Sequence, residues 1–116
     1  MIAFTVPGCP RPKERARRGK GGGWYTPRRT SAYEDAVGWA ARGAGCRKPR
    51  DGRFRVKLDL WFPDHRRVDA DNCCKSVLDA LNGIVWRDDS QVVELVVTRG
   101  IDRACPRAEV VVESLA

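Results

Sequence analysis

Residues 66–93 read RRVDADNCCKSVLDALNGIVWRDDSQVV and are the most informative part of the chain. Apolar side chains recur there at the spacing of an amphipathic helix over about residues 71–84, and a turn follows over 83–90. On a helical wheel, one continuous apolar arc is expected to face a sheet and holds Cys74, Val77, Leu78, Leu81, Ile84 and Val85. The opposite side holds Asp71, Asn72, Lys75, Asp79 and Asn82. The segment therefore predicts a helix with a buried apolar face and a charged solvent face.

The residues before this helix predict a strand that supports it. Apolar and charged side chains alternate from Arg53 to Phe62, as in a half-buried strand, and Pro63 stops the pattern. Residues 64–70 are polar and predict a loop. Two Val-rich strands are expected after the helix, over residues 91–98 and 107–114, and we expect residues 99–106 to join them as an antiparallel pair.

The N-terminal part of the chain adds one strand and one helix. Residues 2–6 are β-prone and end at a Pro-Gly pair. Ser31 and Glu34 have the spacing of a capping box, which predicts a helix from Ser31 to about Gly43 with Tyr33, Val37, Ala40 and Ala41 on its apolar stripe. The predicted fold is α+β: a single small domain over residues 1–116 in β-α-β-α-β-β order, with helices packed on a mixed sheet.

Charge is distributed unevenly along the chain. Lys and Arg number 22 and Asp and Glu 15, which gives a net charge of +7. Residues 1–50 carry 12 basic and 3 acidic side chains, whereas residues 51–116 carry 10 and 12. This asymmetry favours a surface that binds a polyanion, next to a slightly acidic half with a different chemical role. The alternative is a basic face that serves only solubility.

The basic excess is concentrated in residues 11–29. This glycine-rich segment buries too little apolar surface to hold regular structure by itself, so we predict a mobile basic loop. Its side chains are suited to bind DNA phosphates, and Trp24 or Tyr25 is suited to stack on an unpaired base. The alternative for Trp24 is a loop anchor that packs on the domain. The predicted DNA-binding residues are Arg11, Lys13, Arg15, Arg17, Arg18, Lys20, Arg28 and Arg29.

Acidic side chains gather around the second helix. Asp69 and Asp71 straddle its start, and Asp88 and Asp89 lie in the turn after it. Converging carboxylates repel one another, and a divalent metal relieves that repulsion. Oxygen donors without soft ligands suit Mg²⁺ or Mn²⁺, and Lys75 on the same ridge is placed to contact a phosphate. The alternative for each acid taken singly is a helix cap, an exposed ion pair or a turn residue.

These residues and their spacing closely resemble the signature of the RusA-type Holliday junction resolvases. That signature reads D-x-D-N-x-x-K-x-x-x-D-x-L followed by D-D-x-Q-V, and here it is matched from Asp69 to Lys75, at Asp79 and Leu81, and from Asp88 to Val92. The resemblance implies a small homodimeric, Mg²⁺-dependent endonuclease that cuts four-way DNA junctions with paired symmetric nicks. It also implies a bacterial or phage origin and a role in DNA recombination and repair.

The resemblance also implies roles for individual residues. Asp69, Asp71, Lys75 and Asp89 match the family's essential catalytic positions. Asp69, Asp71 and Asp89 are the implied metal ligands, with a secondary role for Asp88. The basic loop is longer than in the best-known type of the family, and two cysteines follow Asn72 at variable positions.

Two other functions stay open on the sequence alone. One is a basic DNA-binding protein without cleavage activity, and the other is a nuclease for other branched or flapped substrates, including RNA. The five cysteines include no C-x-x-C pair and predict free thiols in a reducing cytoplasm. We expect no secretory signal and no membrane span.

Overall fold

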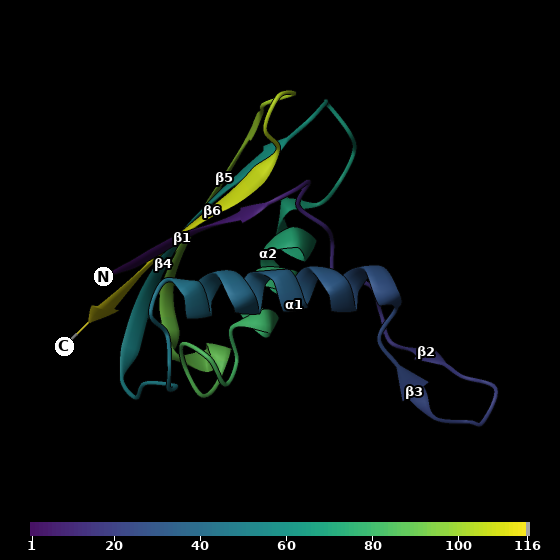
Figure 1. The fold of residues 1–116 in the computed structure, drawn as a ribbon, viewed down its shortest axis with the longest axis horizontal. Coiled ribbons are helices and arrows are strands. Elements are labelled where there is room, and N and C mark those ends of the chain that lie inside the picture. Colours follow the sequence, from purple (N-terminus) through teal and green to yellow (C-terminus); the bar gives the residue numbers. More distant parts are fainter. Residues whose placement is uncertain (116) are drawn as a thin grey trace.

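The computed structural model describes residues 1–115 and places a sheet on one side of two helices (Figure 1). The long strand β4 (Arg53–Phe62) lies inside the sheet, and the strand order is β1-β6-β4-β5. β1 (Ile2–Pro7) and β5 (Val92–Ile101) are the two edges, and β6 (Arg107–Leu115) lies between β1 and β4. β5 runs parallel to β4, whereas β6 is antiparallel to both of its neighbours. The predicted α+β class with a mixed sheet is confirmed.

Both helices cover the same face of the sheet. In β4 the even-numbered residues from Phe54 to Phe62 are buried, while Arg53, Arg55 and Lys57 are exposed. Helix α1 (Arg28–Gly43) buries Tyr33, Val37 and Ala41 of the predicted stripe, and Ala40 is half-buried. Helix α2 (Ala70–Ala80) is the next element after β4 in the chain and packs beside α1 (Figure 1).

The expected pairing of the last two strands is wrong. Residues 92–101 and 107–115 form strands, but β4 lies between them and pairs with both. The reason is the helix that connects β4 to β5: a strand–helix–strand crossover returns the chain parallel to the first strand. β6 then takes the place on the other side of β4, antiparallel to it over Arg53 to Trp61.

The predicted start of the first helix is also wrong. α1 begins at Arg28, after Pro27, and the Ser31 N–H already donates to the Pro27 carbonyl at 3.0 Å. No side chain caps this helix, and Glu34 forms an ion pair with Lys13 instead. Proline suits the end of the preceding extended segment because its φ is fixed, at −53° here.

The second helix is shorter than the predicted 71–84. It ends at Ala80, and Gly83 adopts a φ of +80°, a left-handed conformation that favours glycine and turns the chain. Val85 is buried and Ile84 half-buried, so both still pack on the core outside the helix. Asn82, expected on the solvent face, accepts a hydrogen bond from the indole of the fully buried Trp86 at 2.9 Å.

Residues 11–29 hold more regular structure than we predicted. They contain a two-stranded ribbon, β2 (Arg17–Arg18) paired with β3 (Trp24–Tyr25), and the first residues of α1. The ribbon projects away from the sheet and the helices (Figure 1). Its two strands pair only with each other, and the glycine-rich turn between them forms the tip of the ribbon (Figure 1).

Candidate active site

The first part of the site is the N-terminal end of α2. Asp69 is the N-cap residue, but its side chain makes no capping hydrogen bond, and Asp71 lies exposed in the first turn. Capping therefore does not account for the Asp69 carboxylate. The loop before it is fixed by Arg99, whose guanidinium donates to the Val68 carbonyl at 2.6 Å and lies 4.8 Å from the centre of the Phe62 ring.

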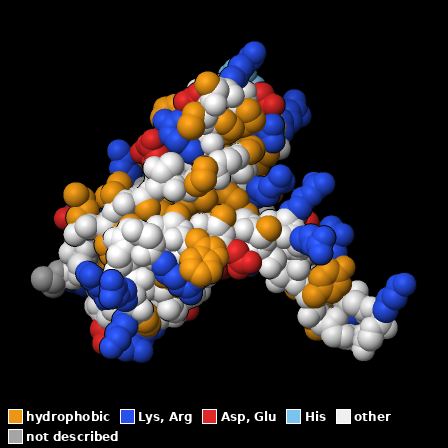
Figure 2. Space-filling view, in the orientation of Figure 1, with side chains coloured by type: hydrophobic (Ala, Val, Ile, Leu, Met, Phe, Trp, Pro, Cys, Tyr) orange, Lys and Arg blue, Asp and Glu red, His pale blue; other side chains and the backbone are white. Residues whose placement is uncertain are grey.

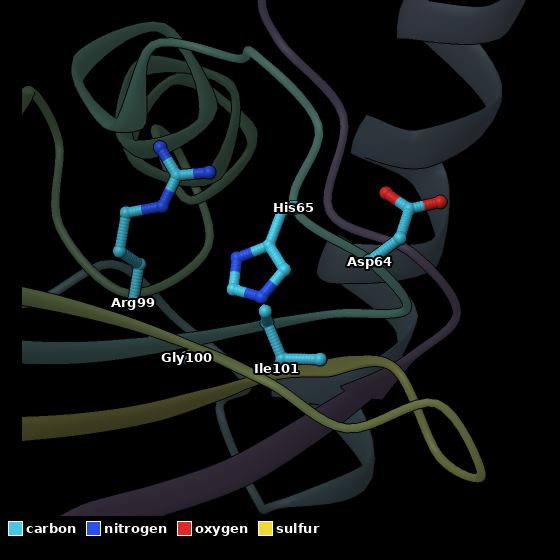
Figure 3. Close-up of a pocket in the computed structure, with 5 residues that line it drawn as sticks. All are labelled: Asp64, His65, Arg99, Gly100 and Ile101. Atoms are coloured by element: carbon cyan, nitrogen blue, oxygen red, sulfur yellow. The ribbon is translucent and has the colours of Figure 1, made fainter.

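A hollow of about 280 Å³ lies beside this loop and contains the chain's one histidine. It is lined by Asp64, His65, Arg99, Gly100 and Ile101, and Figure 3 shows that these side chains lie around it without converging on a common point. The Asp64 carboxylate accepts from Arg66 at 2.8 Å rather than from His65. These side chains therefore do not form one catalytic cluster, and Arg99 is used to hold the loop.

Two adjoining hollows lie along the charged face of α2 and share Lys75. One, of about 250 Å³, is lined by Asp71, Cys74, Lys75, Leu78, Asp89, Leu95 and Val97. The other, of about 480 Å³, is lined by Lys13, Glu14, Arg15, Ala16, Asn72, Lys75 and Asp79. Asp71 and Lys75 from α2 and Asp89 from the turn before β5 thus line one hollow. Asp69 and Asp88 do not line it.

The charges around Asp89 are unbalanced. Its pKa is raised from the ordinary 3.8 by burial, by the negative charge of Asp88 and by close contact with the Asp79 carboxylate, and Lys75 opposes this shift. A raised carboxyl pKa means that the ionised form is disfavoured where it stands. Asp89 is therefore a partly buried carboxyl group with two further carboxylates, Asp88 and Asp79, and one cation, Lys75, around it.

Gln91 holds the turn that carries Asp88 and Asp89. Its side-chain oxygen accepts from the backbone N–H groups of Arg87 and Asp88 at 2.8 and 3.2 Å. Its side-chain nitrogen donates to the carbonyls of Arg50 and Gly52, each at 2.9 Å. All four hydrogen-bonding positions of the amide are used. The sequence motif contains this residue, and its Asp-x-x-Gln spacing, which is that of a capping box, is the signal in the sequence for this structural role.

Asp88 has a structural task in the same turn. It is the N-cap of the short helix η1 (Asp89–Gln91), and its carboxylate accepts from the Ser90 N–H at 3.1 Å. That hydrogen bond lowers the pKa of Asp88. The two neighbouring acids therefore have different surroundings. The Asp88 carboxylate is hydrogen-bonded to the backbone, whereas Asp89 lines the hollow.

The base of the basic segment is attached to the site. The Lys13 N–H donates to the Asn72 carbonyl at 2.9 Å, and the Lys13 ammonium pairs with Glu34 and lies 3.5 Å from Asp79. The Ser76 hydroxyl donates to the Arg11 carbonyl at 2.9 Å. Lys13, predicted among the DNA-binding residues, is thus occupied by two carboxylates and joins the segment to both helices.

The other predicted DNA-binding residues lie along or beside the ribbon. Arg11, Arg15, Arg17, Arg18, Lys20, Arg28 and Arg29 are all exposed, and Arg17 lies 3.5 Å from Glu14. Trp24 is 73% and Tyr25 50% exposed, so neither is buried against the domain. The anchor interpretation of Trp24 is therefore wrong. Figure 2 shows the blue side chains of Lys and Arg around the ribbon.

The cysteines are not paired in disulfides, and two of them are buried in α2. All five are free thiols, and burial raises the pKa of Cys73 and of Cys74 to about 11. Within residues 1–115, no three His, Cys, Asp or Glu side chains are grouped closely enough to hold a metal ion by themselves. In the same residues, no helix is both long and apolar enough to cross a membrane.

Comparisons with known proteins identify the family. A family model described as "Endodeoxyribonuclease RusA" matches residues 7–113 of the 116-residue chain. The chain is also similar to the curated "Uncharacterized protein YqaN" of Bacillus subtilis (strain 168), with 44% identity over 50 residues. That match covers 43% of this chain and only 34% of the relative's length. The family model covers nearly the whole chain, and this protein therefore belongs to the RusA endodeoxyribonuclease family.

Proposed function

We propose that this protein is a divalent-metal-dependent endodeoxyribonuclease that resolves four-way DNA junctions by paired, symmetric cleavage. The observation that carries this proposal is the meeting of Asp71, Lys75 and Asp89 at one hollow, next to a projecting basic ribbon, in a chain of the RusA family. Such an enzyme acts on DNA during recombination and repair in the cytoplasm of a bacterial or phage-infected cell.

The donor set of the site fits Mg²⁺. Mg²⁺ keeps several water ligands and is usually bound by one or two protein carboxylates together with substrate phosphates, so a complete protein cage is not required. Asp71 and Asp89 would hold the ion, and Asp69 at the same helix end is a further ligand in our proposal. The assignment is supported by the two carboxylates next to Asp89, those of Asp88 and Asp79, because a bound cation would relieve the repulsion among them. When bound, the ion supplies neutralisation of charge on the phosphodiester and an activated water.

The remaining groups bind and orient the substrate. Lys75 lies between the two hollows, so its ammonium is placed to contact the non-bridging oxygens of a phosphate that enters either one. A fixed cation at this place stabilises the negative charge that develops during cleavage. Asp79 and Lys13 bind each other, which keeps the base of the ribbon at the rim of the site.

The ribbon is the proposed contact with the junction. Its arginines can pair with phosphate oxygens in bidentate fashion, and the exposed Trp24 can stack on a base at the junction centre, where stacking is interrupted. Replacing Arg15, Arg17 and Arg18 by Ala should weaken binding to all DNA. Each lost phosphate contact should flatten the salt dependence by about 0.9 in log–log slope, and an unchanged slope would refute the role of the ribbon.

Symmetric cutting requires two sites on one particle, which a two-fold dimer supplies. The edge strand β5 supports this proposal, because it leaves backbone groups unpaired and exposes Val93, Leu95 and Val96. Leu95 also lines the hollow of Asp71 and Lys75, so a partner on this edge would lie next to the site. We expect the protein to elute as a particle of twice the chain mass, and a monomer at micromolar concentration would count against paired cleavage.

Substitutions at the acids test the assignment of the site. Asp71→Asn and Asp89→Asn should abolish cleavage of a labelled junction while leaving its binding intact. Glu113→Gln is the matched control, because it removes one exposed carboxylate from β6, away from the hollows of the site. If either site variant cuts as fast as the control, the assigned ligand is wrong. If the unmodified protein binds junctions tightly and never cuts them with metal present, the non-catalytic DNA-binding alternative holds.

A further inference from the structure

A second basic surface lies at the C-terminal end of α1 and in the turn that leads to β4. We call it the α1-end patch, and it consists of Trp39, Arg42, Arg47, Lys48, Arg50 and Arg53, of which every side chain is exposed. Trp39 is 69% exposed, and the Arg42 guanidinium lies 5.2 Å from the centre of its ring. Figure 2 shows Lys and Arg side chains at this end of the molecule as well as over the ribbon.

The cations of the α1-end patch lack acidic partners. Among residues 1–115, none of its four arginines and its one lysine lies within 4.0 Å of a carboxylate. On the outer face of the sheet the situation is different. There Arg55 pairs with Glu94 at 2.6 Å and with Glu113 at 3.2 Å, and Lys57 lies 3.9 Å from Asp59. Unpaired cations beside an exposed indole are typical of surfaces that bind nucleic acid.

The α1-end patch is continuous with the candidate active site. Trp39 and Arg42 lie at the edge of a hollow of about 190 Å³ whose acidic lining residues are Glu34, Asp35 and Asp79. Of these, Asp79 contacts Asp89. The turn is also attached directly to the turn that carries Asp89. The Arg50 N–H donates to the Val85 carbonyl at 2.9 Å, and Gln91 donates to the Arg50 carbonyl. A ligand held by the patch is therefore held in a fixed position relative to the acids.

We infer that the α1-end patch binds the sugar–phosphate backbone of a duplex DNA arm whose other contact is the ribbon. The ribbon lies near the start of α1 and the patch at its end, so the two basic surfaces flank the acidic site (Figures 1 and 2). Arg47, Lys48 and Arg53 contact phosphates, and the indole of Trp39 packs on deoxyribose. This inference rests on the proposed function, because it supposes that DNA is the substrate.

The test is the salt dependence of junction binding, measured by fluorescence anisotropy of a labelled four-way junction in EDTA. The variant R47A/K48A removes one arginine and one lysine from the patch. The control R55A/K57A removes the same two residue types, and hence the same charge, from the outer face of the sheet. All four side chains are exposed, so both variants should unfold at nearly the temperature of the parent.

We expect R47A/K48A to reduce the log–log salt slope by about 1.8, whereas the control keeps the parent slope. Between about 50 and 200 mM salt, the parent should then lose about 12-fold more affinity than this variant. Trp39→Ala should weaken binding by the same factor at every salt concentration, without a change of slope, because its contact is not ionic.

Three results would overturn the inference. A slope for R47A/K48A equal to that of the parent would show that the patch touches no phosphate. Equal slope changes in R47A/K48A and R55A/K57A would show only a dependence on net charge. An unchanged slope together with an altered particle mass would identify the patch as a protein interface. In each case the parent still binds junctions, so the proposed function survives, whereas a parent that binds no DNA refutes both.

Discussion

A substitution of Gln91 tests how much the hydrogen bonds of one side chain contribute to the stability of this fold. Replacing Gln91 by Ala removes four hydrogen bonds. Two are accepted from backbone N–H groups of the turn, at Arg87 and Asp88, and two are donated to the carbonyls of Arg50 and Gly52. A typical intramolecular hydrogen bond contributes about 0.5–1.5 kcal/mol net. The side chain is only half-buried, so water replaces part of this loss. We expect a cost of about 2 kcal/mol in the free energy of unfolding.

Chemical denaturation and thermal unfolding measure this cost. For a chain of this size, about 2 kcal/mol corresponds to a fall of roughly 6–12 °C in Tm. Gln91→Glu should cost at least as much, because a carboxylate keeps the two accepted bonds but faces two carbonyls without a donor. Ser90→Ala is the control from the same turn. Only its backbone N–H is used, so its Tm should stay close to that of the parent.

The same variants separate a positioning role from general stability. Because Gln91 fixes the turn that carries Asp89, Gln91→Ala should slow single-turnover cleavage by about 10- to 100-fold at a temperature where the variant is folded. Its affinity for the junction should stay unchanged, since no phosphate contact is lost. The reasoning would be refuted if Gln91→Ala unfolds at the parent midpoint, or if it cuts at the parent rate.

Three further predictions test other contacts. Asp89→Asn should raise Tm at pH 7. The raised pKa of Asp89 means that ionisation opposes folding, so this gain should vanish as the pH falls below about 3.8 and Asp89 is protonated in both states. Gly100→Ala should destabilise the protein by about 1–3 kcal/mol in denaturant titrations, since the new Cβ would lie 2.7 Å from the ring of Trp61. Lys13→Ala should speed proteolytic cutting of the ribbon, because it removes the ion pairs to Glu34 and Asp79.

The sequence predicted the helices and strands of this fold better than it predicted which strands pair with each other. Alternation predicted the strand from Arg53 to Phe62 with its observed bounds, because one of its faces is buried along its whole length and the other is exposed or half-buried. The same local pattern says nothing about which strand lies alongside. The two C-terminal strands are both rich in valine, and only the helix between β4 and β5 signals that these two strands are parallel neighbours.

The sequence predicted which residue types form the candidate site, but it predicted their arrangement only in part. The spacing of Asp71 and Lys75 placed both on one face of α2, as the structure has them. The different surroundings of Asp88 and Asp89 depend on a short helix and on the hydrogen bonds of Gln91, and charge patterns do not show these. The α1-end patch was not predictable from the sequence, because its residues are spread over a helix end and a turn, and only the fold makes them one surface.

The most direct measurement is cleavage of a labelled mobile four-way DNA junction, with and without Mg²⁺, beside a linear duplex of the same sequence. We expect paired nicks on opposite strands of the junction, only with the metal, and no cutting of the duplex. Tight binding of the junction without any nick in the presence of Mg²⁺ would contradict the proposed function, and the acids around Lys75 would then need a structural explanation.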